Sequence, residues 1–160
     1  MPTSARPAKT ASKWALACAA AASLLAACGT DVEPIAAIWQ PDFETALVEV
    51  RNCRLSPAEH DGFSVRVFAN PLAKQPYLDN AALLPEGALL VKGEYDDANC
   101  TVLARVSAMR KGAVGSDAAL GDWRWQRGTP AGTVEAAANV QSCAGCHSGC
   151  KARDYACTDP

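Results

Sequence analysis

The stretch ALLVKGEY, residues 88–95, has the alternating pattern of a β-strand. Successive side chains of a strand point to opposite faces, so Leu89 and Val91 share one face while Lys92 and Glu94 share the other. Lys92 is therefore expected in the middle of a strand, beside apolar neighbours. Because an unpaired buried ammonium is costly, Lys92 must be paired, neutral or chemically consumed, unless its end reaches water at the edge of the sheet.

Alternation of the same kind indicates further strands on both sides of this stretch. The links between them are short, which favours an antiparallel sheet. Asn70 and Pro71 suit a helix N-cap and first turn. We therefore predict an α+β fold, mainly an antiparallel β-sheet with flanking short helices. The predicted strands span residues 63–69, 88–95, 100–111 and 122–127, with an edge strand after Thr133; helices are predicted at 42–50, at 71–78 and around the motif at 143–147.

The sequence CAGCH, which begins at Cys143, has the spacing that covalent attachment of haem c requires. The thiols of Cys143 and Cys146 would bond to the two vinyl groups of haem, and His147 would ligate the iron. The alternatives are a CxxC disulfide or part of a zinc site, and the histidine directly after the second cysteine favours haem. The other histidine, His60, is expected in a solvent-facing loop, and Met109 is expected to pack rather than to ligate iron.

Residues 1–27 have the features of a lipoprotein signal peptide. A start with three basic residues precedes an apolar run that ends in small residues. Because the run is shorter than the roughly 20 residues of a transmembrane helix, cleavage is expected rather than a permanent anchor. Leu25-Ala26-Ala27-Cys28 resembles the bacterial lipobox, in which Cys28 is acylated; the alternative is a cysteine that follows the alanines by chance. We expect a lipid-anchored protein on the periplasmic side of the bacterial cell envelope.

The expected mature chain has a tether at 28–41 and one compact domain at 42–160. Without the three basic residues of the signal peptide, 12 basic residues face 17 acidic residues. Nucleic acid is therefore excluded as a partner, because phosphate binding needs clustered positive charge. The same negative charge would repel an anionic membrane surface, so membrane attachment is expected to depend on the lipid.

Four cysteines remain after lipidation and haem attachment are assigned and Cys18 is removed with the signal peptide. In an oxidising periplasm an even number favours disulfides, and four cysteines allow three connectivities. We favour pairing Cys53 with Cys100 and Cys150 with Cys157. A metal site made from these four residues is the alternative.

Four motifs, taken in order, resemble the cytochrome P-460 family, which includes the β-sheet cytochromes c-prime. The motifs are VRVFANPLA at 65–73, LPEGALLVKGEYD at 84–96, GDWRWQR at 121–127, and CAGCH. The resemblance extends from His60 to the end of the chain. It implies an antiparallel sheet with flanking helices, often a homodimer, and a five-coordinate haem whose open side faces the sheet.

Two positions match functional residues of that family. Lys92 corresponds to the lysine that is bonded covalently to the haem macrocycle in the hydroxylamine-oxidising members, and Arg66 corresponds to an arginine of the haem pocket. The resemblance thus implies catalytic roles for Lys92 and Arg66. The chain departs from those enzymes in its added cysteines, its short ends and its lipobox. Their acidic proton acceptor is not located here, and Glu94 is only a neighbour of Lys92.

Three classes of function fit these observations. The first is an oxidoreductase that acts on a small nitrogen compound, hydroxylamine or nitric oxide, at an open haem iron. The second is a protein of the same fold that binds or senses nitric oxide without turnover. The third is an electron carrier with two axial ligands that serves a redox partner protein. Few residues could supply a second axial ligand, namely Met109, His60 and Lys92, which argues against the third class.

Overall fold

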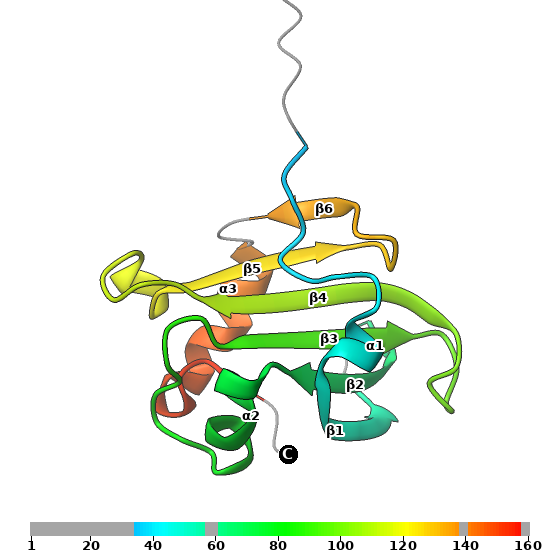
Figure 1. The fold of residues 1–160 in the computed structure, drawn as a ribbon, viewed down its shortest axis with the longest axis horizontal. Helices are drawn as coiled ribbons and strands as arrows, with labels where there is room; N and C mark the ends of the chain where they lie inside the picture. The colour runs from blue at the N-terminus through cyan, green and yellow to red at the C-terminus, as the bar shows by residue number, and fades with distance from the viewer. Residues whose placement is uncertain (1–33, 57–60, 138–140, 158–160) are drawn as a thin grey trace, which may run out of the picture. The chain divides into compact units, whose positions relative to one another are not determined.

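A computed structural model describes residues 34–56, 61–137 and 141–157 (Figure 1). Six strands form one sheet in chain order, and every neighbouring pair is antiparallel. Short helices flank the sheet, as the sequence predicts. The strands are β1 Val48–Leu55, β2 Ser64–Ala69, β3 Leu89–Tyr95, β4 Leu103–Lys111, β5 Trp123–Gly128 and β6 Val134–Ala137; the helices are α1 Phe43–Ala46, α2 Pro71–Leu78 and α3 Gln141–His147, with 3₁₀ turns η2 Ala118–Leu120 and η3 Ser148–Arg153.

The predicted start of α2 is confirmed in detail. The Asn70 side chain accepts a hydrogen bond from the backbone N–H of Ala73 at 3.0 Å, and Pro71 occupies the first turn, where no donor is lost. Asn70 Oδ1 also accepts from the backbone N–H of Leu89 at 3.1 Å. One side chain therefore both begins the helix and ties it to the start of β3.

The predicted helix at 42–50 is wrong beyond Ala46. The chain leaves the helix at Leu47 and enters β1, which continues to Leu55. The apolar residues whose spacing favoured one helix are divided between α1 and β1. Phe43 is buried on α1, and Val50 is buried on β1. The strand forms here because pairing with the outer edge of β2 satisfies backbone groups of both strands. His60 lies outside the described residues.

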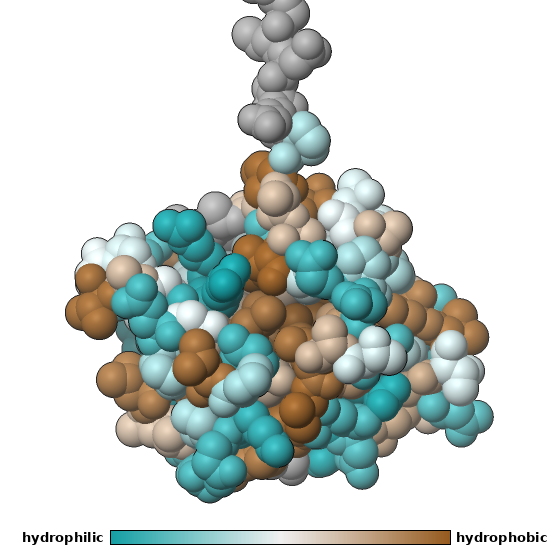
Figure 2. Space-filling view, in the orientation of Figure 1, coloured by the Kyte–Doolittle hydropathy of each residue, from teal (hydrophilic) through white to brown (hydrophobic). Residues whose placement is uncertain are grey.

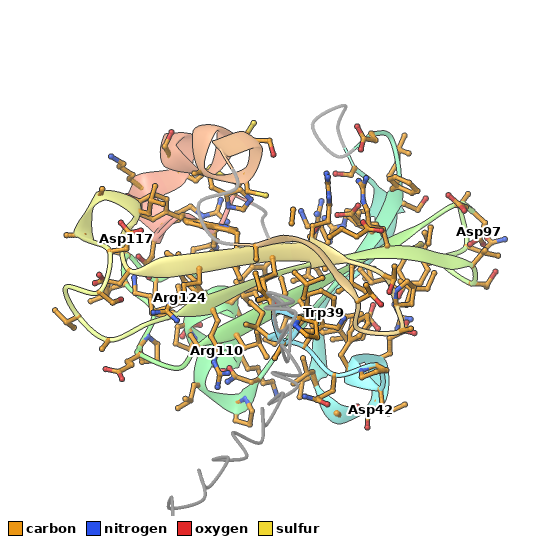
Figure 3. All side chains as sticks on the ribbon, turned by 90° about the horizontal axis from the view of Figure 1, so that it is seen from above. Trp39, Asp42, Asp97, Arg110, Asp117 and Arg124 are labelled. Atoms are coloured by element: carbon orange, nitrogen blue, oxygen red, sulfur yellow. A yellow bond between two sulfur atoms is a disulfide. The ribbon has the colours of Figure 1, made fainter. Side chains whose placement is uncertain are left out.

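The two faces of the sheet bury different clusters (Figure 3). The face that we call the Phe68 face is covered by the segment before β1, with Trp39 and Phe43 packed against Phe68. The opposite face, called the Lys92 face, packs against α2 through Ala73 and Tyr77 and against the chain after β6, where Tyr155 meets Trp125 at 6.2 Å between ring centroids. The N-terminal end of the described domain thus covers one face, while α2 and the C-terminal segment pack on the other.

The predicted tether needs correction at its described end. Trp39 is only 2% exposed, and the Gln126 amide both accepts from the N–H of Ile38 at 2.7 Å and donates to the carbonyl of Ala36 at 3.1 Å. Apolar side chains gather at the middle of this face, within a polar rim (Figure 2). The packed domain therefore begins near Ala36, since an indole needs burial and a sheet face needs a cover. Cys28 and the signal peptide lie outside the described residues.

Both disulfides are present in the favoured pairing. Cys53 and Cys100 join β1 to the turn before β4, and Cys150 and Cys157 close the segment after α3. Cys143 and Cys146 carry free thiols. No helix in the described part of the chain is long and apolar enough to cross a bilayer.

Candidate functional site

Strand register builds the centre of the site on the Lys92 face. Lys92 is opposite Val67 on β2 and Ser107 on β4, and Ser107 is opposite Arg127 on β5. Paired residues of neighbouring strands point to the same side of a sheet. Four strands therefore present one row of side chains, in which Lys92 is flanked by an apolar residue and a hydroxyl.

Burial lowers the pKa of Lys92 to about 8, from an ordinary value of 10.5. The positive charge of Arg51 acts in the same direction, whereas Glu94 and Cys143 act against it. A large fraction of this amine is therefore uncharged near pH 8, where a lysine becomes a nucleophile or a ligand.

Glu94 lies one row away on the same face and is completely buried. Its carboxylate accepts hydrogen bonds from Arg105 Nε at 2.5 Å and from Ser107 Oγ at 2.6 Å. Arg105 also binds Asp61 at 2.9 Å. The Glu94 carboxylate thus forms a buried ion pair with Arg105, and it acts on Lys92 against the effect of burial.

Helix α3 brings the CAGCH motif onto this face. Cys143 packs against the apolar cluster of the Lys92 face, while Cys146 is exposed. Burial raises the pKa of the Cys143 thiol, and the charges of Arg127 and Glu94 also act on it. The apolar cluster that Cys143 contacts contains Val67, which is opposite Lys92, so the first cysteine of the motif lies on the face of Lys92.

His147 is fixed in one tautomer. Its Nδ1 is 2.6 Å from the carbonyl oxygen of Tyr155, and because a carbonyl can only accept, Nδ1 must carry the proton. The lone pair is then on Nε2, the nitrogen that would coordinate iron. The ring also lies 6.0 Å from the Trp125 ring, centroid to centroid, which limits its rotation.

The structure places Arg66 away from this site, which corrects the implied role in the haem pocket. Arg66 is opposite Gly93, the residue next to Lys92, so its side chain points to the face of the sheet opposite Lys92. There it binds Glu49 and Glu44, and Glu49 chiefly raises its pKa. Because its charge is neutralised on the Phe68 face, Arg66 cannot act over an iron on the Lys92 face.

Sequence reasoning missed two arginines that do belong to the Lys92 face. Arg51 is opposite Val67, and Arg127 is opposite Ser107, so both share the row of Lys92. None of the predicted strands contains Arg51. Arg127 was within a quoted motif, and only strand register reveals its neighbours. Met109 is buried in the cluster of this face, as expected of a packing residue.

The residues present fit a haem. Two adjacent free thiols and an oriented imidazole are the donors that haem c takes, and they lie beside an apolar wall that includes Trp125. Within the described residues, Trp125 Nε1 and Arg127 Nε are buried without a hydrogen-bond partner. Such donors normally find one, so this face suits an occupant that brings both apolar surface and acceptor atoms.

Comparison with known proteins supports the same assignment. The family model described as Cytochrome P460 matches residues 45–158, which covers the sheet and the CAGCH motif. No curated protein matches the chain. The matched region contains the strand of Lys92 and the helix of His147, which the structure brings together. The chain therefore belongs to the cytochrome P460 family and is a haem-binding cytochrome.

Proposed function

We propose that this protein is a lipid-anchored periplasmic c-type cytochrome with an open iron site, acting as an oxidoreductase on hydroxylamine or nitric oxide. The observation that carries the proposal is the position of α3, which sets the CAGCH motif against the sheet face of Lys92. Haem bound there would supply an iron centre for redox chemistry on a small ligand. His147 would hold that iron through Nε2, and Cys143 and Cys146 would hold the ring.

The chain's own residues suit a small substrate. Lys92 presents an amine whose lowered pKa allows a neutral form near pH 8, and Glu94 adds a fixed carboxylate on the same face. Trp125 and the buried apolar residues around it would exclude water from the ring. These features favour chemistry on a compact nitrogen compound over binding of a large ligand.

Mass spectrometry tests covalent attachment directly. The chain should be produced with a haem c maturation system, and its mass should exceed that of the polypeptide by one haem. A variant with both Cys143 and Cys146 changed to serine is the matched control and should stay unmodified. An unmodified wild-type chain would end the c-type assignment.

Peptide mapping decides between turnover and ligand capture. If Lys92 is bonded to the macrocycle, as the family resemblance implies, its peptide should remain joined to the peptide of Cys143 and Cys146 after digestion. The absorption spectrum should then contain a red-shifted band that Lys92→Ala abolishes. Lys74→Ala, an exposed lysine on α2, is the control and should leave the band unchanged.

A second candidate function is nitric oxide binding without turnover. It is favoured if the Lys92 peptide separates from the haem peptide, because the buried apolar wall would then serve only to hold a neutral ligand. A reduced spectrum typical of six-coordinate, low-spin haem would instead indicate an electron carrier. Both outcomes would overturn the proposed oxidation of hydroxylamine.

A further inference from the structure

A buried ion pair involves Asp154, the residue before Tyr155, whose carbonyl orients His147. Lys111, the last residue of β4, places its Nζ 2.6 and 2.7 Å from the two carboxylate oxygens of Asp154. The two side chains are only 7% and 5% exposed. Asp154 Oδ2 also accepts the backbone N–H of Leu84 at 2.8 Å. The carboxylate is therefore held by two segments that are far from it in the sequence.

The backbone at this point has an unusual conformation. Asp154 and the next residue, Tyr155, both adopt left-handed φ values, 49° and 67°. Two successive non-glycine residues in this region persist only where surrounding contacts impose it. The Tyr155 ring supplies one such contact, because it packs so closely on Gly121 that any side chain there would overlap it. The ion pair of Asp154 supplies the other.

This conformation determines where the Tyr155 carbonyl lies. The backbone N–H of Tyr155 donates to the carbonyl of Cys150 at 3.0 Å, and its own carbonyl accepts from Nδ1 of His147. The Cys150–Cys157 disulfide closes the same segment. Lys111, Asp154 and Tyr155 thus form a continuous set of contacts from the end of β4 to the imidazole.

We propose that Lys111 and Asp154 are positioning residues that fix the Tyr155 carbonyl on His147 and thereby set the ferric–ferrous equilibrium of the haem iron. This inference rests on the proposed function. A buried ion pair is weak evidence for stability, since its desolvation offsets its attraction, but it fixes geometry well. The hydrogen bond at Nδ1 makes Nε2 more electron-rich, which favours ferric iron.

The test compares Asp154→Asn with the wild-type holoprotein. Asparagine tolerates left-handed φ and still accepts the Leu84 N–H, so the change removes mainly the charge that binds Lys111. We expect about a tenfold shift of the equilibrium toward ferrous iron, a rise of ~59 mV in the reduction potential for a one-electron couple. Lys111→Met should shift the potential in the same direction.

Glu49→Gln is the matched control, because it replaces a paired carboxylate by an amide on the opposite face. It should leave the potential unchanged. If it moves the potential as far as Asp154→Asn does, or if Asp154→Asn yields a folded holoprotein with the wild-type potential, the inference is overturned. Should Asp154→Asn fail to fold, Lys111→Arg retains the charge with altered geometry, and a wild-type potential there also overturns it.

A second readout does not require haem. In the haem-free wild-type chain, the His147 Nδ1 proton should give a slowly exchanging NMR signal, because it is bonded to Tyr155. Asp154→Asn should speed its exchange at least tenfold, and Glu49→Gln should not. If the wild type lacks covalent haem while this difference holds, the proposed function fails and the positioning role stands. If the exchange does not change, the positioning role fails whatever the haem content.

Discussion

Lys92 should weaken the fold that contains it, and replacing it by methionine should therefore stabilise the haem-free domain. Burial lowers the pKa of Lys92 from 10.5 to about 8. Below pH 8 the amine is protonated in both the folded and unfolded chains, and the folded state bears the full cost of the buried charge. Between pH 8 and 10.5 only the unfolded chain keeps the proton, so stability rises with pH; above 10.5 the cost is gone.

The size of the effect follows from the two pKa values. Each tenfold difference in proton affinity corresponds to about 1.4 kcal/mol, so the lowering amounts to about 3 kcal/mol. Part of the side chain reaches water, which reduces the expected cost to about 2 kcal/mol. Methionine has similar length and no charge, so it should recover this free energy at pH 7 while preserving the packing against Val67.

Urea unfolding followed by tryptophan fluorescence measures the effect, because Trp39, Trp123 and Trp125 are buried. The difference between variant and wild type should be about 2 kcal/mol at pH 7 and close to zero at pH 10.5. Taking the difference between the two chains cancels the contribution of Tyr95. Burial raises the pKa of Tyr95, so its ionisation at high pH destabilises both chains equally. Lys74→Met is the control. Equal stabilities at pH 7, or a less stable Lys92→Met, would refute the reasoning.

Three further predictions concern the cysteines and Glu94. Changing Cys53 and Cys100 to serine should lower the unfolding free energy by about 4 kcal/mol, and changing Cys150 and Cys157 should lower it by about 2 kcal/mol, because the first disulfide closes the longer loop. Urea unfolding measures both losses, and equal losses would contradict this argument from loop length. Glu94→Gln should cost about 2–3 kcal/mol, since Arg105 then keeps only its exposed partner Asp61, whereas a Glu94→Leu/Arg105→Met double variant should lose less; urea unfolding measures both. Cys28→Ala should release the protein from the membrane fraction, and unchanged fractionation would reject the lipobox.

The inner strands could be predicted because their alternation has one interpretation. In β3, Lys92 and Glu94 alternate with Val91, Gly93 and Tyr95, and in β5 Trp123 and Trp125 alternate with Arg124 and Gln126. β1 could not be predicted, since Phe43, Leu47 and Val50 fit a helical stripe as well as two shorter elements. An edge strand is stabilised by its partner, which a local pattern does not contain.

Arg66 shows a second limit of sequence reasoning. Alternation correctly puts Arg66 with Phe68 on one face of β2 and Lys92 with Leu90 on one face of β3. Whether these faces coincide depends on register, and a shift of one residue reverses the answer. Arg66 is opposite Gly93, so the two cations lie on opposite sides. The bond between His147 and Tyr155 was equally hidden, because it needs two residues with positive φ.

The distribution of charge on the two faces indicates which one binds haem. On the Phe68 face, Arg66 is neutralised by Glu44 and Glu49, and Trp39 fills the apolar centre. On the Lys92 face, Arg127 keeps a buried Nε–H that no described group accepts, although the neighbouring Glu94 is bound by Arg105. A sheet that needed only a packed core would place apolar residues in this row. Haem combines a large apolar ring with two carboxylates, so it matches both the apolar wall and the cations of this face.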